Sequence, residues 1–393
     1  MTTGSIRPGT RTRLTSLTGV RFFAAFAVFL FHIAIGRPFA DKALSDGAFT
    51  VFCKAGWVGV SFFFVLSGFI LTWSARPQDS TTAFWRRRLV KVFPNHLVTH
   101  TATMALYAGA TVAGGTAVLN LLLLQPWVPD EDVYFSVDNP SWSLGCELFF
   151  YLLFPLLHRA VARVRAHRLW GCALSLMAAV IALPAVVSAL VPAEPSMLAP
   201  DKPLPASAFW LVYVFPVTRV LDFVLGIVMA RIVLEGRWRR FRPLPLTALF
   251  VACYAASLYL PAVYALNAAT IVPVALLIPA VAHLDTAGRH TWLRARSLQW
   301  LGEVSFAFYL VHWPVLVYGR RLLGETRQYS WPAGIGLTAA CAALSLLIAA
   351  LLYTGVERPA MRRWASARPR PRPLTAVPTD ELPAPPAAAG PTH

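Results

Sequence analysis

The stretch LTGVRFFAAFAVFLFHIAIG, residues 17–36, carries only two ionisable side chains, Arg21 and His32. About 20 predominantly apolar residues in a helix match the thickness of the hydrocarbon core of a bilayer, so this stretch predicts a membrane-spanning helix. Because a helix turns about 100° per residue, Arg21 and His32 lie on nearly the same face, about 16 Å apart along the axis. Ionisable groups are costly in hydrocarbon, which favours a functional role for the pair. In the structural alternative, Arg21 reaches the headgroups and His32 bonds to a neighbouring helix.

Apolar stretches of this kind recur along the whole chain, which is 57% hydrophobic and only 13% charged. Soluble domains carry about twice that charged fraction, so we expect an all-α polytopic membrane protein. The stretch from 115 to 140 falls short of a full span and is expected to be re-entrant or interfacial. About ten transmembrane helices are predicted, at residues 17–36, 55–74, 94–115, 141–160, 169–192, 209–233, 244–262, 268–285, 300–318 and 332–353.

The net charge of +17 is distributed as short basic segments between the apolar stretches. With the N-terminus inside, about 25 of the 35 Lys and Arg residues are cytoplasmic, as the positive-inside rule requires. This layout predicts a multi-pass protein of the plasma membrane with both termini in the cytoplasm. The sequence contains no aromatic and basic module typical of nucleic-acid binding, so we expect the lipid bilayer, and no nucleic acid, as a partner.

Three regions are expected along the chain. Residues 1–16 form a cytoplasmic segment, 17–360 form the transmembrane domain, and 361–393, rich in Pro and Ala, form a disordered cytoplasmic tail. The five cysteines are scattered without CxxC spacing, which predicts neither a disulfide framework nor a zinc site. We therefore expect no bound metal and no permanently bound cofactor.

The predicted fourth span carries a polar face. Ser143, Glu147 and Tyr151 recur at a spacing of four, which aligns them along one side of a helix. Glu147 lies about 9 Å below the outer end of that helix, where a carboxylate needs a cationic or hydrogen-bonding partner or stays protonated. A purely structural hydrogen bond to Tyr151 is the alternative. Asn139 and Pro140, just before the span, are typical of an N-cap and a first helical residue.

The predicted ninth span carries a second polar face, because Ser305, Tyr309 and His312 follow one another at steps of four and three. A lone histidine in such a position is as often a satisfied contact between helices as a functional group. In the sixth span, Arg219 and Asp222 lie three residues apart. We interpret them as a structural ion pair.

The predicted loop after the second span is strongly basic, with Arg86, Arg87, Arg88 and Lys91 close together. These residues are either ordinary topology anchors or ligands for phosphates at the membrane surface. For the second role arginine offers bidentate donors and lysine a point charge.

Six stretches occur in one order along the chain and together resemble the membrane-bound acyltransferase family 3. They are SLTGVRFFAAFAVFLFHI, GWVGVSFFFVLSGFILT, FWRRRLVKVFPNH, NPSWSLGCELFFYLLFPLL, LGEVSFAFYLVHWPV and VERPA, and they extend over about residues 17–360. The resemblance implies an integral membrane enzyme that moves an acyl group from acyl-coenzyme A, as co-substrate, to a hydroxyl group of an acceptor.

The resemblance also implies roles for the basic residues. An arginine and a histidine separated by ten residues are required in the family, and they match Arg21 and His32. A basic R-x-x-R motif falls on Arg88 and Lys91, where lysine replaces the second arginine and leaves a charge without a bidentate donor. These cations are expected to hold the phosphates of acyl-coenzyme A.

A mechanism follows for the predicted site. His32 acts as general base on the acceptor hydroxyl, because an alcohol is a poor nucleophile until it loses its proton. Glu147, which with Trp142 matches a family motif, orients His32 or stabilises its cation, and Tyr309 or His312 stabilises the oxyanion. The expected site residues are Arg21, His32 and Glu147 for catalysis, Arg86, Arg88 and Lys91 for acyl-coenzyme A, and Trp142, Ser143, Tyr151, Ser305, Tyr309 and His312 for the acceptor.

The acceptor is expected to be a macrolide or related secondary metabolite of antibiotic biosynthesis, in keeping with the single-domain length and the Ala/Arg/Pro bias of the chain. A cell-surface polysaccharide or cell-wall glycan fits the depth of His32 and Glu147 equally well. A proton-coupled transporter would also need buried ionisable groups, but the two halves of the sequence show no paired broken helices and no internal repeat. A scaffold or sensor is a third class, in which replacing Arg21 or His32 leaves function intact.

Overall fold

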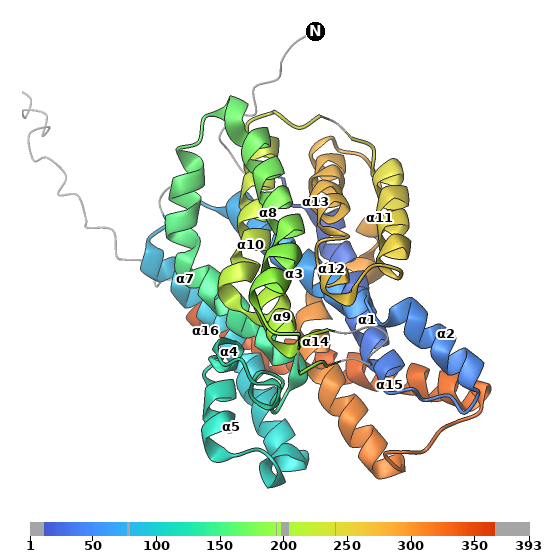
Figure 1. Ribbon diagram of the computed structural model, residues 1–393. Coiled ribbons are helices and arrows are strands. Elements are labelled where there is room, and N and C mark those ends of the chain that lie inside the picture. Colours follow the sequence, from blue (N-terminus) through green and yellow to red (C-terminus); the bar gives the residue numbers. More distant parts are fainter. Residues whose placement is uncertain (1–11, 77–78, 194, 198–203, 240, 366–393) are drawn as a thin grey trace, which may run out of the picture.

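The computed structural model describes residues 12–365, apart from 77–78, 194, 198–203 and 240. Within these residues the chain is helical, with no β-strand, and the helices pack together in one bundle (Figure 1). The predicted disordered tail 361–393 is wrong at its start, because residues 361–364 continue the helix α16; its part beyond Ala365 lies outside the described residues, as does most of the predicted segment 1–16. The helices are α1 (Thr15–Ile35), α2 (Lys42–Phe52), α3 (Ala55–Ser74), α4 (Thr81–Leu106), α5 (Gly114–Leu121), α6 (Glu131–Tyr134), α7 (Trp142–Ala162), α8 (Leu169–Leu190), α9 (Ala206–Phe209), α10 (Pro216–Leu234), α11 (Pro243–Ser257), α12 (Ala262–Ala265), α13 (Ile271–Thr286), α14 (Arg296–Leu323), α15 (Trp331–Leu352) and α16 (Arg358–Trp364).

Many of these helices are suited to a bilayer, so the predicted all-α multi-pass class is confirmed. The count of ten stays a prediction, because α11 and α13 have only 15 and 16 residues and α4 is too polar to qualify by hydropathy. Among the described residues, seven stretches are long and apolar enough to cross a membrane: Thr15–Ile35, Lys42–Ser74, Asn139–Ala162, Ala166–Leu190, Ala206–Leu234, Arg296–Leu323 and Trp331–Trp364.

The largest difference from the predicted boundaries is in α4. Its predicted span starts at residue 94, but the helix begins at Thr81 and ends at Leu106. The Ser80 side chain caps its start by accepting a hydrogen bond from the Ala83 N–H, and arginine and lysine continue a helix readily. The basic cluster therefore lies on the first turns of a helix and not in a loop.

α3 and α10 run parallel at the centre of the bundle, with α7 and α8 on one side and α11 and α13 on the other (Figure 1). A Cβ at Gly68 would overlap the Phe223 carbonyl oxygen, and one at Gly226 would overlap that of Val65. Glycine at these two positions lets the backbones approach closely. Residue numbers increase in the same direction along both segments from one contact to the next, which shows that the segments are parallel: Gly56 meets Tyr213, Ser61 meets Arg219, and Gly68 meets Phe223.

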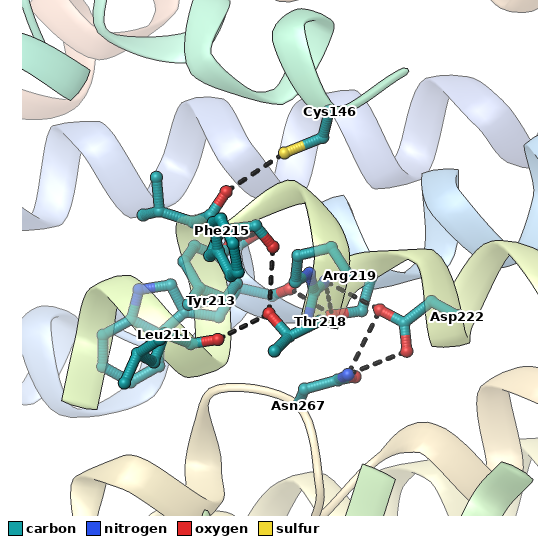
Figure 2. Close-up of polar contacts among 12 residues, drawn as sticks. Cys146, Leu211, Tyr213, Phe215, Thr218, Arg219, Asp222 and Asn267 are labelled. Carbon is teal, nitrogen blue, oxygen red and sulfur yellow. Dashed lines mark hydrogen bonds and ion pairs between the residues drawn. The ribbon is translucent and has the colours of Figure 1, made fainter. Parts of the chain in front are cut away.

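A buried ion pair fixes this central contact (Figure 2). Arg219 Nη2 lies 3.0 Å from Asp222 Oδ2, and both side chains are 1% exposed. Asn267 Nδ2 donates to both Asp222 oxygens, at 2.9 and 3.1 Å. Arg219 also donates to Ser61 Oγ at 2.8 Å, which ties α10 to α3. The predicted structural ion pair between Arg219 and Asp222 is confirmed.

α1 lies between α3 and α14, and α1 and α14 are also parallel. A Cβ at Gly302 would overlap the Thr18 carbonyl oxygen, so the two helices are in close contact near their starts. The Arg320 guanidinium donates to the Gly36 carbonyl near their ends. This register places the middle of α14, where Tyr309 and His312 lie, beside the second half of α1.

Candidate active site

A cavity of about 150 Å³ lies among α1, α3, α4, α7 and α14. It brings together eight of the twelve predicted site residues, although they are spread over almost 300 residues of sequence. The helical periodicities explain much of this, because the polar faces of α7 and α14 both point into the cavity. The predicted residues that line it are Arg21, Arg88, Lys91, Ser143, Glu147, Tyr151, Ser305 and Tyr309.

One part of the cavity wall is cationic. Arg21 and Arg88 both line it, and neither forms an ion pair with a carboxylate of the described residues. Lys91 differs from them, because its ammonium group pairs with the buried Glu357 carboxylate. Asn95 Nδ2 donates to the other oxygen of Glu357 at 2.6 Å. Two guanidinium groups therefore remain available to an anionic ligand.

Glu147 belongs to the polar face of α7 and lines the same cavity as these cations. Its carboxylate accepts a hydrogen bond from Tyr151 Oη at 2.7 Å. It lies close enough to Arg21 and Arg88 for their charges to act on it, although no ion-pair contact forms. Among the described residues Glu147 makes no hydrogen bond with His32, so the structure gives no support to the expectation that Glu147 orients that imidazole.

Tyr309 and Ser143 are in contact with each other on the cavity wall. Tyr309 Oη lies 2.8 Å from Ser143 Oγ and donates to the Pro140 carbonyl oxygen at 3.3 Å. The Phe63 ring packs edge-on against Tyr309, with 5.9 Å between centroids. On its other side Tyr309 contacts the His312 ring, at 5.9 Å between centroids. The tyrosine thus separates the cavity from the histidines behind it.

His32 and His312 form a hydrogen-bonded pair, with 2.9 Å between His32 Nδ1 and His312 Nε2. The hydrogen bond between His312 and the Phe308 carbonyl oxygen determines which ring nitrogen of each histidine carries the proton. His312 Nδ1 lies 3.3 Å from the Phe308 carbonyl oxygen, which only accepts, so Nδ1 carries the proton. In a neutral His312 the Nε2 atom is then the acceptor, and His32 Nδ1 is the donor. The Nε2 atom of His32 is left with its lone pair, which is the state that a general base requires.

His32 does not line the cationic cavity. It lines a second cavity of about 40 Å³ between α1, α14 and α15, and no residue lines both. Arg21 and His32 therefore share a helix face, as predicted, but open into different spaces. Tyr309 and His312 lie between them.

Three other predicted site residues lie away from the cationic cavity. Arg86 is exposed on the surface of α4. Trp142 is 3% exposed and packs on the Tyr213 ring, at 4.9 Å between centroids. His312 is fully buried and reaches only its neighbours in the protein.

Two residues of this region had no functional role in the sequence reasoning. Glu357 belongs to the VERPA stretch, and its position just beyond a long apolar segment was the available signal. Asn139 was expected as an N-cap, but α7 starts at Trp142 and the preceding residue Ser141 makes no capping hydrogen bond. The N-cap prediction for Asn139 is wrong: its side chain lies beside the His32 ring instead.

Comparisons with known proteins identify the family. The profile of an acyltransferase domain matches residues 14–354. Acyltransferase MdmB of Streptomyces mycarofaciens is 43% identical over 94% of this chain and 97% of its own length. The exopolysaccharide production protein ExoZ of Rhizobium meliloti is 29% identical over 80% of this chain and 92% of its own length. Peptidoglycan O-acetyltransferase OatA of Listeria monocytogenes is 23% identical over 89% of this chain, which spans only 56% of that relative.

No solved structure shows significant similarity to the chain. The family assignment therefore rests on sequence, through the domain profile and through a relative that is similar over nearly its full length. Both support the resemblance inferred from the six motifs. The chain belongs to acyltransferase family 3 and is a multi-pass membrane acyltransferase.

Proposed function

We propose that the protein is an O-acyltransferase of the plasma membrane that moves an acetyl or short-chain acyl group from acyl-coenzyme A to a hydroxyl group of a macrolide or related secondary metabolite. The observation that carries the proposal is the histidine pair, which leaves the His32 Nε2 atom with its lone pair and contacts Tyr309, a residue of the cation-lined cavity. The similarity to acyltransferase MdmB over almost the whole of both chains supports a single-domain enzyme of this kind.

The cationic cavity is the proposed site for the donor. Its volume of about 150 Å³ holds on the order of ten water-sized groups, enough for the acyl group and the end of the pantetheine arm that carries it but not for the nucleotide. Arg21 and Arg88 line it and are free to bind phosphate oxygens, whereas the exposed Arg86 lies away from it on α4. Lys91, whose ammonium group pairs with Glu357, adds positive charge to the cavity but offers no bidentate hydrogen-bond donor.

In the proposed reaction, His32 Nε2 takes the proton of the acceptor hydroxyl as its oxygen attacks the thioester carbonyl. The tetrahedral intermediate collapses with loss of the coenzyme A thiolate, which receives the proton from His32. His312 accepts the His32 Nδ1–H throughout, fixing the tautomer and stabilising the imidazolium. This assigns His312 a positioning role. Ser143 and Tyr309 line the donor cavity and supply hydroxyl donors for the oxyanion once the acyl group has displaced their hydrogen bonds to the Pro140 carbonyl oxygen and to each other.

A second candidate acceptor is a cell-surface polysaccharide or cell-wall glycan. The similarity to a protein named for peptidoglycan O-acetylation and to one named for exopolysaccharide production favours it. With the N-terminus in the cytoplasm, Arg21 lies toward the cytoplasmic end of α1 and His32 toward the outer end, so a glycan outside the cell could meet the acyl group there.

The test uses membranes that contain the wild type, His32→Ala or His167→Ala, supplied with radiolabelled acetyl-coenzyme A. His167 is an exposed histidine outside the site and serves as the matched control. Erythromycin A, a macrolide with free hydroxyl groups, and purified peptidoglycan are offered as acceptors. We expect label in the macrolide with the wild type and His167→Ala but not with His32→Ala. Label only in peptidoglycan would move the acceptor to the cell wall, and transfer that survives His32→Ala would overturn the mechanism.

A further inference from the structure

We propose that the second cavity, between α1, α14 and α15, is the binding site of the acceptor, and that it selects a largely apolar molecule with a hydroxyl group. This inference rests on the proposed function and names the place where its second substrate binds. His32 lines this cavity and is only partly buried, whereas its partner His312 is fully buried. A hydroxyl that enters the cavity therefore meets the imidazole on which the reaction depends.

The ring nitrogen that can act as the base is the one that is not bonded to His312. His32 Nδ1 is occupied by His312 at 2.9 Å, so Nε2 is the ring nitrogen left for a ligand. The Asn139 side chain also lies beside this ring but does not line the cavity. The two cavities have no lining residue in common, and Tyr309 lies between the donor cavity and the histidine pair, so donor and acceptor bind in separate spaces and Tyr309 has to move aside for the acyl group to meet the hydroxyl at His32. Such an arrangement suits direct transfer in a ternary complex.

The walls of the second cavity indicate the class of acceptor. They are mainly apolar, with Ile33, Leu316, Leu337 and Pro38 among them, and Thr338 is one of the few hydroxyl groups. A polysaccharide chain buries many hydroxyl groups and needs a hydrogen-bond partner for each. These walls offer few partners, so they fit the apolar face of a macrocycle better than a sugar chain.

One side of the cavity lies at the surface of the protein, near the end of α14. Leu323, Gly324 and Arg327 line the cavity and are exposed. Arg320 bonds to the Gly36 and Glu325 carbonyl oxygens, which fastens the end of α14 to the end of α1. The cavity itself, at about 40 Å³, admits only the hydroxyl-bearing edge of a ligand, so the rest of the acceptor must lie over this side.

The cavity can be filled without disturbing the fold. Gly319 lines it, and a Cβ at that position would meet no heavy atom within 4 Å. Gly336 on α15 has the same open surroundings but does not line the cavity. Gly319→Leu and Gly336→Leu therefore form a matched pair. For Gly319→Leu we expect the KM for erythromycin A to rise at least about tenfold, which corresponds to about 1.4 kcal/mol, with the KM for acetyl-coenzyme A within about twofold of the wild type. Gly336→Leu should leave both constants unchanged.

A binding measurement supplies a readout that does not depend on turnover. Cys341 also lines the cavity, so bound erythromycin A should slow its modification by N-ethylmaleimide in both wild type and His32→Ala, followed peptide by peptide by mass spectrometry. An unchanged macrolide KM in Gly319→Leu, together with unprotected Cys341, would overturn the site while macrolide acylation by the wild type leaves the proposed function standing. If Gly319→Leu instead impairs only peptidoglycan acylation, the apolar class of acceptor is wrong. If the wild type acylates neither probe, the proposed function itself fails and this inference falls with it.

Discussion

Replacing His312 by leucine should reduce kcat strongly while leaving both KM values nearly unchanged. The lost contact is the 2.9 Å hydrogen bond to His32 Nδ1, made by a fully buried partner. During the reaction His32 becomes an imidazolium, so this bond is one to a charged group, worth about 1.5–3 kcal/mol. At 1.36 kcal/mol for each factor of ten, kcat should fall about 10- to 150-fold. The substrates do not touch His312, so their binding is not expected to change.

His312→Gln and Val311→Ala separate this positioning role from a packing role. The glutamine carbonyl oxygen can accept the His32 Nδ1 proton at similar reach, so His312→Gln should keep more activity than His312→Leu. Val311 is the neighbouring residue on α14 and is 5% exposed. Val311→Ala should lower stability without changing the kcat of the folded protein. Initial rates with acetyl-coenzyme A and erythromycin A, each varied in turn, provide the constants. The reasoning is refuted if His312→Leu keeps kcat within about twofold, or if glutamine rescues no better than leucine.

Three further changes test other parts of the structure. Arg88→Ala should raise the KM for acetyl-coenzyme A about tenfold or more by removing a donor from the cavity wall, whereas the exposed Arg86→Ala should change it by less than about threefold; equal effects in initial-rate assays would contradict the assignment. Asp222→Leu should destabilise the protein by about 3–5 kcal/mol because it leaves the Arg219 charge buried alone, and adding Arg219→Met should restore most of the loss in thermal unfolding; a double variant as unstable as the single one would contradict this. Asp138 is fully buried, neither carboxylate oxygen has a hydrogen-bond partner among the described residues, and burial raises its pKa well above the usual range. Stability should therefore fall as pH rises from the ordinary carboxyl pKa of about 3.9 toward the raised value, and Asp138→Asn should raise the melting temperature at pH 7 and weaken this dependence, whereas a lower melting temperature would exclude the explanation.

Contacts within one helix were predictable from the sequence, since they follow from the turn of the helix alone. The spacing of four placed Ser143, Glu147 and Tyr151 in one cavity, and the spacing of three predicted the Arg219–Asp222 pair. The ends of α1, α3 and α15 agree with prediction within two residues, because runs of about 20 apolar residues are unambiguous. The start of α4 was not predictable from hydropathy, because its first turns are charged.

Contacts between distant helices were not predictable, because they depend on how the helices are arranged around one another. The bond of His32 to His312 joins residues 280 positions apart, and the pair of Lys91 and Glu357 joins residues 266 positions apart. Helical periodicity gives the face on which each residue lies but not the helix that it meets. For the same reason the sequence suggested Glu147 as the partner of His32, which the structure does not support.

The parallel arrangement of α3 and α10 restricts how often the chain crosses the membrane. Two crossing helices that point the same way must be joined by an odd number of further crossings. Between them, among the described residues, lie two candidates by hydropathy, α7 and α8, so we predict that α4 is the third. Its polar residues Asn95, His96, Thr99 and His100 are at most 7% exposed, whereas Leu97 and Val98 are 45% and 44% exposed. On this prediction α4 crosses the membrane with its polar side chains turned toward the protein interior, which a hydropathy average along the chain cannot detect.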